Sequence, residues 1–250
     1  MIEEQTRNIS SLKDQFAVIT GASSGIGKSI ALGLATKGTR LCLLGRHSET
    51  LEAVAEIAQK TTTSVLCYRI DLTMDQEIRK LADYLQREFG HIDLLIHSAG
   101  VISLDRLESA TVEDFDWQYR TNVRAPYVLT QALLPMLRSR QGQIVFLNSS
   151  AGLNAGANIG QYAATKHALK AIADSFRQEV NAEGLRVLSV YPGRTATPMQ
   201  VAVFKMEGRE YHPEFLMQPE DVAVMVINAL SLPRSAEVTE ISVRPLIKSY

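Results

Sequence analysis

Tyr162 and Lys166 stand four residues apart at the start of a segment with helical periodicity. Residues four apart share one face of a helix, so the lysine ammonium would lie beside the phenol. A neighbouring positive charge favours the phenolate and would lower the phenol's pKa from about 10 toward the range of a general acid or base. Tyrosine and lysine also occur at this spacing by chance, so a catalytic role for this pair depends on the surrounding motifs.

A glycine-rich turn, Thr20–Gly27, lies between a predicted strand and a predicted helix. Glycines allow a tight turn and let the backbone approach a pyrophosphate, whose charge the amides and dipole of the new helix stabilise. An ordinary connection between a strand and a helix is the alternative, because such connections also use glycine. The residues predicted to bind the dinucleotide here are Gly21, Ser23, Ser24, Gly25, Ile26 and Gly27.

The end of the second predicted strand indicates which dinucleotide would bind. An acidic residue there would bind the ribose hydroxyls of NAD, but the strand ends in Gly45, Arg46 and His47. Arg46 could instead make a bidentate contact to a 2′-phosphate, which favours NADP(H), and the alternative is an arginine that only caps the strand in solvent. Asp71, after the third strand, could accept a hydrogen bond from adenine or serve as a helix N-cap.

Composition excludes several classes of function. The 250 residues are 46% apolar and 21% charged, and 26 Lys and Arg against 27 Asp and Glu give a net charge of −1. This balance opposes binding to nucleic acid or anionic lipid by bulk charge. With no apolar leader and no apolar run of about 18 residues, neither secretion nor a membrane span is expected. We predict reduced thiols at Cys42 and Cys67, a cytoplasmic location and no bound metal.

Short β-rich runs alternate with longer segments of helical period, which predicts a parallel sheet covered by helices. The predicted strands are Phe16–Thr20, Arg40–Gly45, Ser64–Ile70, Asp93–His97, Gln143–Asn148, Arg186–Tyr191 and Val238–Arg244. The predicted helices are Ile26–Lys37, Glu49–Gln59, Asp75–Phe89, Val112–Arg138, Tyr162–Glu183 and Pro219–Leu230. We predict one domain over 1–250, with a polar surface arm at 1–15 and an aperiodic substrate-binding loop at 194–218.

Several separated motifs, in their order and spacing, resemble the short-chain dehydrogenase/reductase family over almost the whole chain. They are Thr20–Gly27, His97-Ser98-Ala99-Gly100, Asn122, Ser149, Tyr162-Ala163-Ala164-Thr165-Lys166, Pro192-Gly193 and Thr197. The resemblance implies a three-layer α/β Rossmann fold, with a doubly wound sheet of seven parallel strands in the order 3-2-1-4-5-6-7. It also implies a homo-oligomer, either a dimer or a tetramer.

The resemblance further implies that Asn122, Ser149, Tyr162 and Lys166 are catalytic. Tyr162 would exchange a proton with the substrate oxygen during hydride transfer, and Ser149 would hydrogen-bond that oxygen. Lys166 would hold the nicotinamide ribose and lower the pKa of Tyr162, while Asn122 would bind a water that links Lys166 to solvent. Together with Arg46 and Asp71, the further cofactor contacts implied are His47, Leu72, Ser98, Ala99, Gly100, Tyr162, Lys166, Pro192, Gly193, Thr195 and Thr197.

Two positions depart from the family pattern. His97 stands where the family usually has asparagine, and we expect it to tie neighbouring strands together through side-chain hydrogen bonds. Thr195 stands where a valine or isoleucine amide usually contacts the nicotinamide carboxamide. Because the backbone makes that contact, we expect the substitution to be mild.

Arg194, Met199 and Phe204 in the 194–218 loop are the candidate substrate contacts, because flexible apolar side chains and a cation suit a carbonyl compound with an acidic end. The alternative is that they only pack the loop against the core. We predict an NADP(H)-dependent oxidoreductase that interconverts a carbonyl and a secondary alcohol, acting on a small 3-oxo or 3-hydroxy acid or a related ketone or aldehyde. A 3-oxoacyl-thioester reductase and a non-catalytic NADP-binding regulator are the alternatives.

Overall fold

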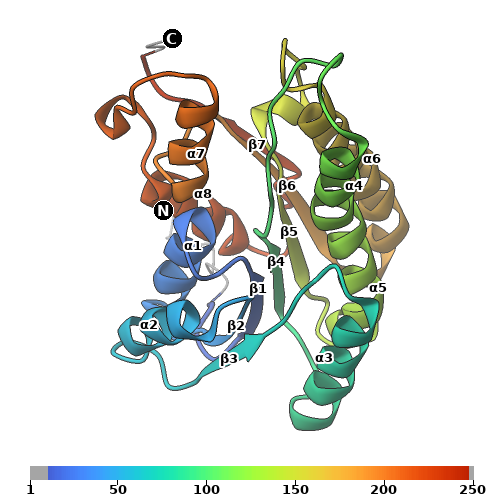
Figure 1. Cartoon of the computed structure of the whole chain (residues 1–250). Coiled ribbons are helices and arrows are strands. Elements are labelled where there is room, and N and C mark those ends of the chain that lie inside the picture. Colours follow the sequence, from blue (N-terminus) through green and yellow to red (C-terminus); the bar gives the residue numbers. More distant parts are fainter. Residues whose placement is uncertain (1–10, 248–250) are drawn as a thin grey trace, which may run out of the picture.

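The computed structural model describes residues 11–247, in which seven strands form one parallel sheet of order β3-β2-β1-β4-β5-β6-β7 (Figure 1). The strands are β1 (Phe16–Thr20), β2 (Arg40–Gly45), β3 (Val65–Arg69), β4 (Leu94–His97), β5 (Gln143–Leu147), β6 (Arg186–Pro192) and β7 (Glu240–Val243). The predicted strand order is confirmed. Because the order reverses between β1 and β4, a crevice is expected above the carboxyl ends of these two strands.

Helices cover both faces of the sheet (Figure 1). They are α1 (Gly25–Ala35), α2 (Ser48–Ala58), α3 (Asp75–Glu88), α4 (Val112–Tyr119), α5 (Ala125–Arg138), α6 (Gly160–Val180), α7 (Pro198–Met206) and α8 (Pro219–Leu230). Helices α1, α2 and α8 bury their apolar faces in one core cluster, whereas α3, α5 and α6 bury theirs in the other. The sheet therefore lies between two hydrophobic layers.

The strand β1 illustrates why its sequence is apolar without a break. Ala17 and Ile19 belong to the core cluster on the α1 side, and Phe16 and Val18 belong to the cluster on the α3 side. A strand with helices on both faces buries every side chain, so the alternation of polar and apolar residues seen in half-exposed strands is lost.

The structure corrects the prediction of one helix over Val112–Arg138. A π-helical turn, Arg120–Arg124, separates α4 from α5, and the Ala125 amide donates to the carbonyl of Arg120, five residues back. Such a turn inserts one residue into the helix and is frequent at functional sites. Asn122 lies within this turn and is buried.

The structure also corrects the prediction that 194–218 has no regular structure. Helix α7 occupies its first half, and Thr197 caps this helix by accepting a hydrogen bond from the Gln200 amide at 3.3 Å. Thr197 followed by Pro198 is a helix-start signal that the absence of a clear period concealed. Of the arm predicted at 1–15, residues 1–10 lie outside the described residues, and Leu12 is buried in the core.

Candidate active site

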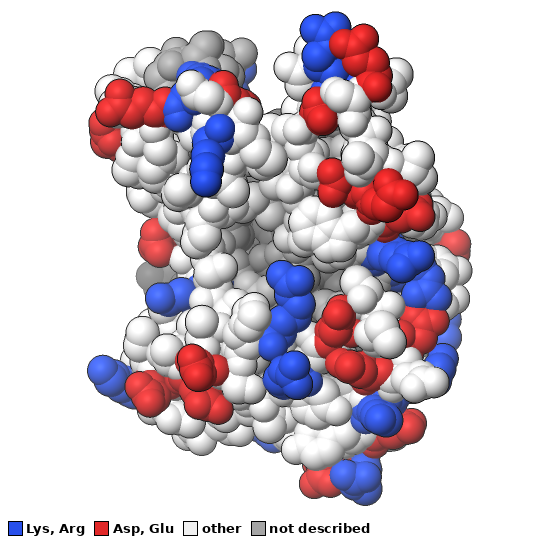
Figure 2. Space-filling model, viewed as in Figure 1, with Lys and Arg blue, Asp and Glu red and all other residues white. Residues whose placement is uncertain are grey.

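A cavity of about 370 Å³ opens at the carboxyl ends of the strands. Figure 2 shows the surface hollowed between the regions that Figure 1 labels α1 and α7 on one side and α4 on the other. The predicted site residues that line it are Gly21, Ser23, Ser24, Gly25, Ile26, Arg46, His47, Asp71, Leu72, Ser98, Ala99, Gly100, Tyr162, Lys166, Thr197 and Met199. The cavity thus connects the glycine turn to the Tyr162–Lys166 pair.

Two glycines of the turn, Gly21 and Gly27, have no space for a side chain. Gly21 has φ +63°, and a Cβ added there would lie 2.8 Å from the backbone of Ala99. A Cβ on Gly27 would lie 2.4 Å from the carbonyl oxygen of Gly21. The Thr20 hydroxyl accepts hydrogen bonds from the amides of Ser98 and Ala99, each at 3.0 Å. The turn and the segment after β4 therefore form one tightly packed wall of the cavity.

Helix α1 begins at this wall and provides a place for an anion. In the described chain, the Ser24 side chain makes no capping hydrogen bond, and the first turn of α1 contains no acidic residue. By contrast, α4 is capped by the Thr111 side chain and carries Glu113 and Asp114 in its first turn. The amides at the start of α1 are thus available to a phosphate group. The residues present fit the pyrophosphate of a dinucleotide.

Two arginines lie together beside the other end of the cavity. Arg46 lines the cavity, and Arg69 at the end of β3 donates from Nε to the Arg46 carbonyl at 3.1 Å. Within residues 11–247 neither side chain forms an ion pair. Asp71 is the only acidic residue among the described residues that line the cavity. This end therefore favours a group with an additional negative charge.

Asp71 is not the N-cap of the following helix. Its Oδ1 accepts from the amide and the hydroxyl of Thr73, at 2.9 and 2.8 Å, and α3 begins only after Met74. The capping alternative is therefore wrong, and the contact with adenine stays a prediction.

Tyr162 and Lys166 occupy the first two turns of α6 and are 7% and 4% exposed. Burial raises the pKa of Tyr162 to about 12, and a hydrogen bond with Ser149 partly opposes this increase. Burial also lowers the pKa of Lys166 to about 8. The lysine Nζ lies 5.7 Å from the centroid of the Tyr162 ring. The pKa of Tyr162 is therefore raised, not lowered as predicted, because the effect of burial exceeds that of the hydrogen bond with Ser149.

Asn122 lies near Lys166, as expected, but uses its side chain within the protein. Its Oδ1 accepts from the Val101 amide at 2.8 Å, and its Nδ2 donates to the Val101 carbonyl at 2.9 Å and to the Thr165 hydroxyl at 3.1 Å. It thereby fixes the segment after β4 to the start of α6. Its binding of a relay water stays a prediction.

Several predicted contacts lie behind the lining of the cavity. Gly193 donates its amide to the Val243 carbonyl at 2.7 Å, and the Thr195 hydroxyl donates to the Gly193 carbonyl at 3.1 Å. The predicted site residues outside the lining set are Gly27, Asn122, Ser149, Pro192, Gly193, Arg194, Thr195 and Phe204. Their direct contacts with a ligand stay predictions.

Arg194 pairs with a residue of its own segment. Its Nη2 donates to the Glu207 carboxylate at 2.6 Å, and its guanidinium lies 5.0 Å from the centroid of the Phe204 ring. These contacts fix α7 to the chain that follows β6. A substrate acid would therefore compete with Glu207 for this cation.

Sequence reasoning missed part of the lining. The missed residues are Gly45, Ile70, Thr73, Val101, Trp117, Thr121, Leu147, Asn148 and Pro198. Trp117 and Thr121 are four residues apart and face the cavity from the helical segment that contains Asn122. That spacing, read together with Asn122, could have indicated them.

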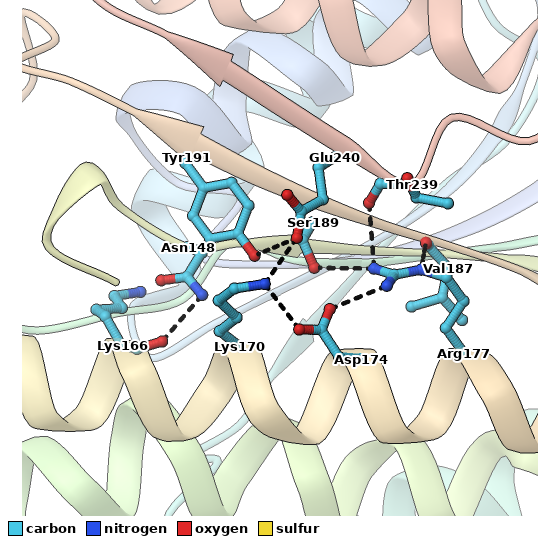
Figure 3. Close-up of polar contacts among 10 residues, drawn as sticks. All are labelled: Asn148, Lys166, Lys170, Asp174, Arg177, Val187, Ser189, Tyr191, Thr239 and Glu240. Atoms are coloured by element: carbon cyan, nitrogen blue, oxygen red, sulfur yellow. Dashed lines mark hydrogen bonds and ion pairs between the residues drawn. The ribbon is translucent and has the colours of Figure 1, made fainter. Parts of the chain in front are cut away.

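The middle of α6 is anchored to the sheet by charged side chains (Figure 3). Lys170 donates to Asp174 on its own helix at 2.7 Å and to Glu240 of β7 at 2.8 Å. Arg177 donates to the carbonyls of Val187 and Thr239 at 2.8 and 3.1 Å. These contacts hold the helix that carries Tyr162 and Lys166 against β6 and the chain leading into β7.

The His97 side chain hydrogen-bonds to a helix, not to a neighbouring strand. Its Nε2 is 2.8 Å from the hydroxyl of Thr130 on α5, and its ring stacks on Phe146 of β5 at a centroid distance of 4.9 Å. Burial lowers its pKa to about 3, so the imidazole is neutral at physiological pH. The expected hydrogen bonds between strands are therefore replaced by one bond to a helix and a ring stack.

Known proteins resemble this chain over most of its length. The family model of the short chain dehydrogenases matches residues 15–208. An uncharacterized oxidoreductase of Staphylococcus epidermidis is 33% identical over 236 residues, which cover 94% of this chain and 99% of that protein. The chain belongs to the short-chain dehydrogenase/reductase family and is an oxidoreductase of this type.

Two of the solved structures that resemble this chain cover almost all of it. A metagenomic short-chain oxidoreductase in complex with NADP is 30% identical with a TM-score of 0.82, over 96% of this chain and 100% of that chain. An alcohol dehydrogenase from Thermococcus sibiricus, complexed with 5-hydroxy-NADP, is 26% identical with a TM-score of 0.85, over 95% and 99%. Within residues 11–247, no helix is long and apolar enough to cross a membrane, and no cluster of three metal-binding side chains occurs.

Proposed function

We propose that the protein is an NADP(H)-dependent oxidoreductase that interconverts a carbonyl and a secondary alcohol, with Tyr162 as the proton donor and acceptor. The observation that carries this proposal is one cavity that joins the uncapped start of α1 and Arg46 to buried Tyr162 and Lys166. The complexes of the two related structures with NADP and 5-hydroxy-NADP support the same cofactor.

The start of α1 and the Gly21–Gly27 turn would hold the pyrophosphate through backbone amides. Arg46, with Arg69 beside it, would bind the 2′-phosphate. Bound NADPH would supply the hydride that reaches the carbonyl carbon.

Tyr162 keeps its proton at neutral pH because its pKa is about 12, so the phenol can donate that proton to the carbonyl oxygen. Ser149, already hydrogen-bonded to Tyr162, would orient the same oxygen. With a pKa of about 8, Lys166 is mostly protonated at pH 7. Its ammonium would stabilise negative charge that develops on the phenol oxygen as the proton leaves.

The substrate is proposed to be a small 3-oxo or 3-hydroxy acid or a related ketone or aldehyde. Met199 lines the cavity, and Phe204 packs behind it beside Arg194, which would suit a compact substrate with an apolar part. A homo-oligomer is also proposed, because Phe115, Tyr119 and Tyr127 leave aromatic surface exposed on α4 and α5. Sedimentation velocity tests the oligomer.

We also propose a cytoplasmic location. Cys42 and Cys67 are both free. They pack into core clusters on opposite faces of the sheet, which is typical of reduced thiols.

The function is tested by mixing the purified chain with NADPH and a carbonyl panel, and following the loss of nicotinamide absorbance. The panel holds acetoacetate, ethyl acetoacetate, acetoacetyl-thioester, a cyclic diketone and an aromatic aldehyde. Removing the donor in Tyr162→Phe should lower turnover about 10²- to 10⁴-fold and leave NADPH binding unchanged. Turnover that survives this substitution would refute the mechanism, and a chain that binds no NADPH would refute the cofactor assignment.

A further inference from the structure

Asn148 follows the last residue of β5 and is 5% exposed. Its Oδ1 accepts from the Ser149 amide at 2.9 Å, and its Nδ2 donates to the Lys166 carbonyl at 3.0 Å. Figure 3 shows the Asn148 side chain directed at the backbone of α6 beside Lys166. One side-chain amide therefore joins the segment that carries Ser149 to the helix that carries Tyr162 and Lys166.

The neighbours of Asn148 contact the same groups. The Leu147 carbonyl accepts from Lys166 Nζ at 3.1 Å, so the end of β5 binds both the backbone and the ammonium of this lysine. Ser149 hydrogen-bonds Tyr162. Three consecutive residues, 147 to 149, thus reach every side chain proposed to act on the carbonyl oxygen.

The backbone at Gly152 packs against the Asn148 amide. A Cβ added to Gly152 would lie 2.5 Å from Asn148 Oδ1 and 3.0 Å from the Lys166 carbonyl oxygen. The turn after Ser149 therefore closes directly over the amide. A side chain held in this way sets a distance between two elements and does not merely fill space.

The other polar anchors of α6 do not reach β5. Lys170 binds Glu240 of β7, and Arg177 binds carbonyls of β6 and of the residue before β7. Among the described residues, Asn148 and the Leu147 carbonyl make the polar contacts between α6 and the end of β5. The spacing between Ser149 and Tyr162 consequently depends on this junction.

We propose that Asn148 is a positioning residue, whose amide holds Ser149 at the correct distance from Tyr162 and Lys166. This inference rests on the proposed function, because the groups that it aligns are the ones assigned to proton transfer. Small displacements of such groups lower rates by large factors, about 100-fold for 1 Å. Asn148 therefore affects turnover although it does not take part in the reaction.

The test compares Asn148→Ala, Ser149→Ala and the double variant with the wild-type chain, with NADPH and the best substrate of the carbonyl panel. Asn148→Ala should lower kcat about 10- to 100-fold and change the Kd of NADPH by less than about twofold. Trp117, the one tryptophan of the sequence, lines the cavity and reports NADPH binding by its fluorescence. In the Ser149→Ala background, Asn148→Ala should lower kcat by less than about threefold, because the hydroxyl that Asn148 is proposed to position is already lost.

Gln143→Ala is the matched control. Gln143 is also a buried amide on β5, and it donates to a helix carbonyl, that of Leu230, at 3.0 Å, but at the opposite end of the strand. Its loss should lower the midpoint of thermal unfolding about as much as Asn148→Ala does, with kcat changed by less than about twofold. If Asn148→Ala does not fold, Asn148→Ser replaces it, with a smaller loss of kcat in the same direction.

Equal kcat for Asn148→Ala and Gln143→Ala would overturn the proposal, and so would independent, multiplicative losses in the double variant. Failure of the proposed function has a different signature. If NADPH does not quench the Trp117 fluorescence of the wild-type chain and the chain reduces no carbonyl, the proposed function is refuted before any variant is compared.

Discussion

The two sides of the cavity are built by different means. On the cofactor side, the wall consists of backbone, with Gly21 and Gly27 packed so closely that a single methyl group would collide with the main chain. On the substrate side, the segment after β6 combines main-chain bonds, such as that from the Ala196 amide to the Met217 carbonyl, with side-chain contacts such as the Arg194–Glu207 pair. Where the main chain packs this closely, few residues can be substituted without moving the backbone. Where side chains make the contacts, single residues can be substituted one at a time. The contrast predicts where substitutions should be most damaging.

The largest effect is expected from Gly21→Ala, compared with Gly208→Ala on the substrate side. Both glycines have left-handed backbones, with φ +63° and +65°, but only Gly21 has neighbouring atoms within 4 Å of an added Cβ. Gly208→Ala should cost about 1–2 kcal/mol from backbone strain alone, and Gly21→Ala about 2–5 kcal/mol because the collision adds to the strain. Urea unfolding measures the loss of unfolding free energy in both variants. Equal losses would show that the two sides of the cavity do not differ in their tolerance of a side chain.

A smaller but more specific effect is expected at Arg46. Arg46→Asp should lower the preference for NADPH over NADH, as the ratio of kcat/KM values, about 100-fold, because a charge-assisted contact becomes a repulsion. Arg69→Ala should lower it severalfold, since this arginine lies beside the first. Lys60→Asp carries the same charge change on an exposed residue beyond α2 and should leave the ratio unaltered. An unchanged ratio in Arg46→Asp would exclude the phosphate contact.

His97 should make the fold sensitive to acid. Its folded pKa is about 3, below about 6.5 in the unfolded chain, so the unfolded chain binds more protons between these values. The stability that depends on a neutral His97 is therefore complete above about pH 6.5 and decreases as pH falls toward 3. The loss at pH 5 should be about 2 kcal/mol. Urea unfolding of wild type and His97→Gln at pH 7 and pH 5 tests this, and parallel losses in both proteins would contradict it.

The smallest effect is expected from the Arg194–Glu207 pair. Both partners are about four-fifths buried, and Glu207→Gln should raise the KM for the neutral ethyl acetoacetate severalfold, because α7 loses this contact, while the Kd of NADPH stays the same. Arg194→Ala distinguishes a contact between Arg194 and the substrate from a purely structural role of Arg194. A larger loss on acetoacetate than on its ethyl ester would support a substrate contact, and equal losses would leave it with a structural role in the segment.

The sequence was informative where function depends on residues close together in the chain. The strand order, the glycine turn and the Tyr162–Lys166 pair follow from short motifs and from their spacing. Asn148 was missed because it donates to the backbone carbonyl of Lys166, which is 18 residues away in the chain. A contact to a backbone group leaves no trace in the type of the partner residue. The pKa of Tyr162 was predicted in the wrong direction for a related reason, since a neighbouring charge can be read from sequence and burial cannot.

Helix boundaries failed for local reasons. The π turn at Asn122 inserts a residue without disturbing the apolar pattern, so periodicity read Val112–Arg138 as one helix. Helix α7 was missed although Thr197 and Pro198 mark its start, because its short apolar sequence has no clear polar face. The Arg194–Glu207 pair was missed because Glu207 comes into reach of Arg194 only when α7 forms.

The buried ammonium of Lys166 has a thermodynamic consequence for the whole molecule. Its pKa is about 8 when folded, against about 10.4 for a lysine in water. The unfolded chain binds more protons between these values, so stability rises with pH across that window, and the full penalty applies below pH 8. The penalty is about 3 kcal/mol, a large share of the roughly 5–15 kcal/mol that stabilises a typical domain. An apolar residue at this position would give a more robust protein that had lost the charge beside its tyrosine.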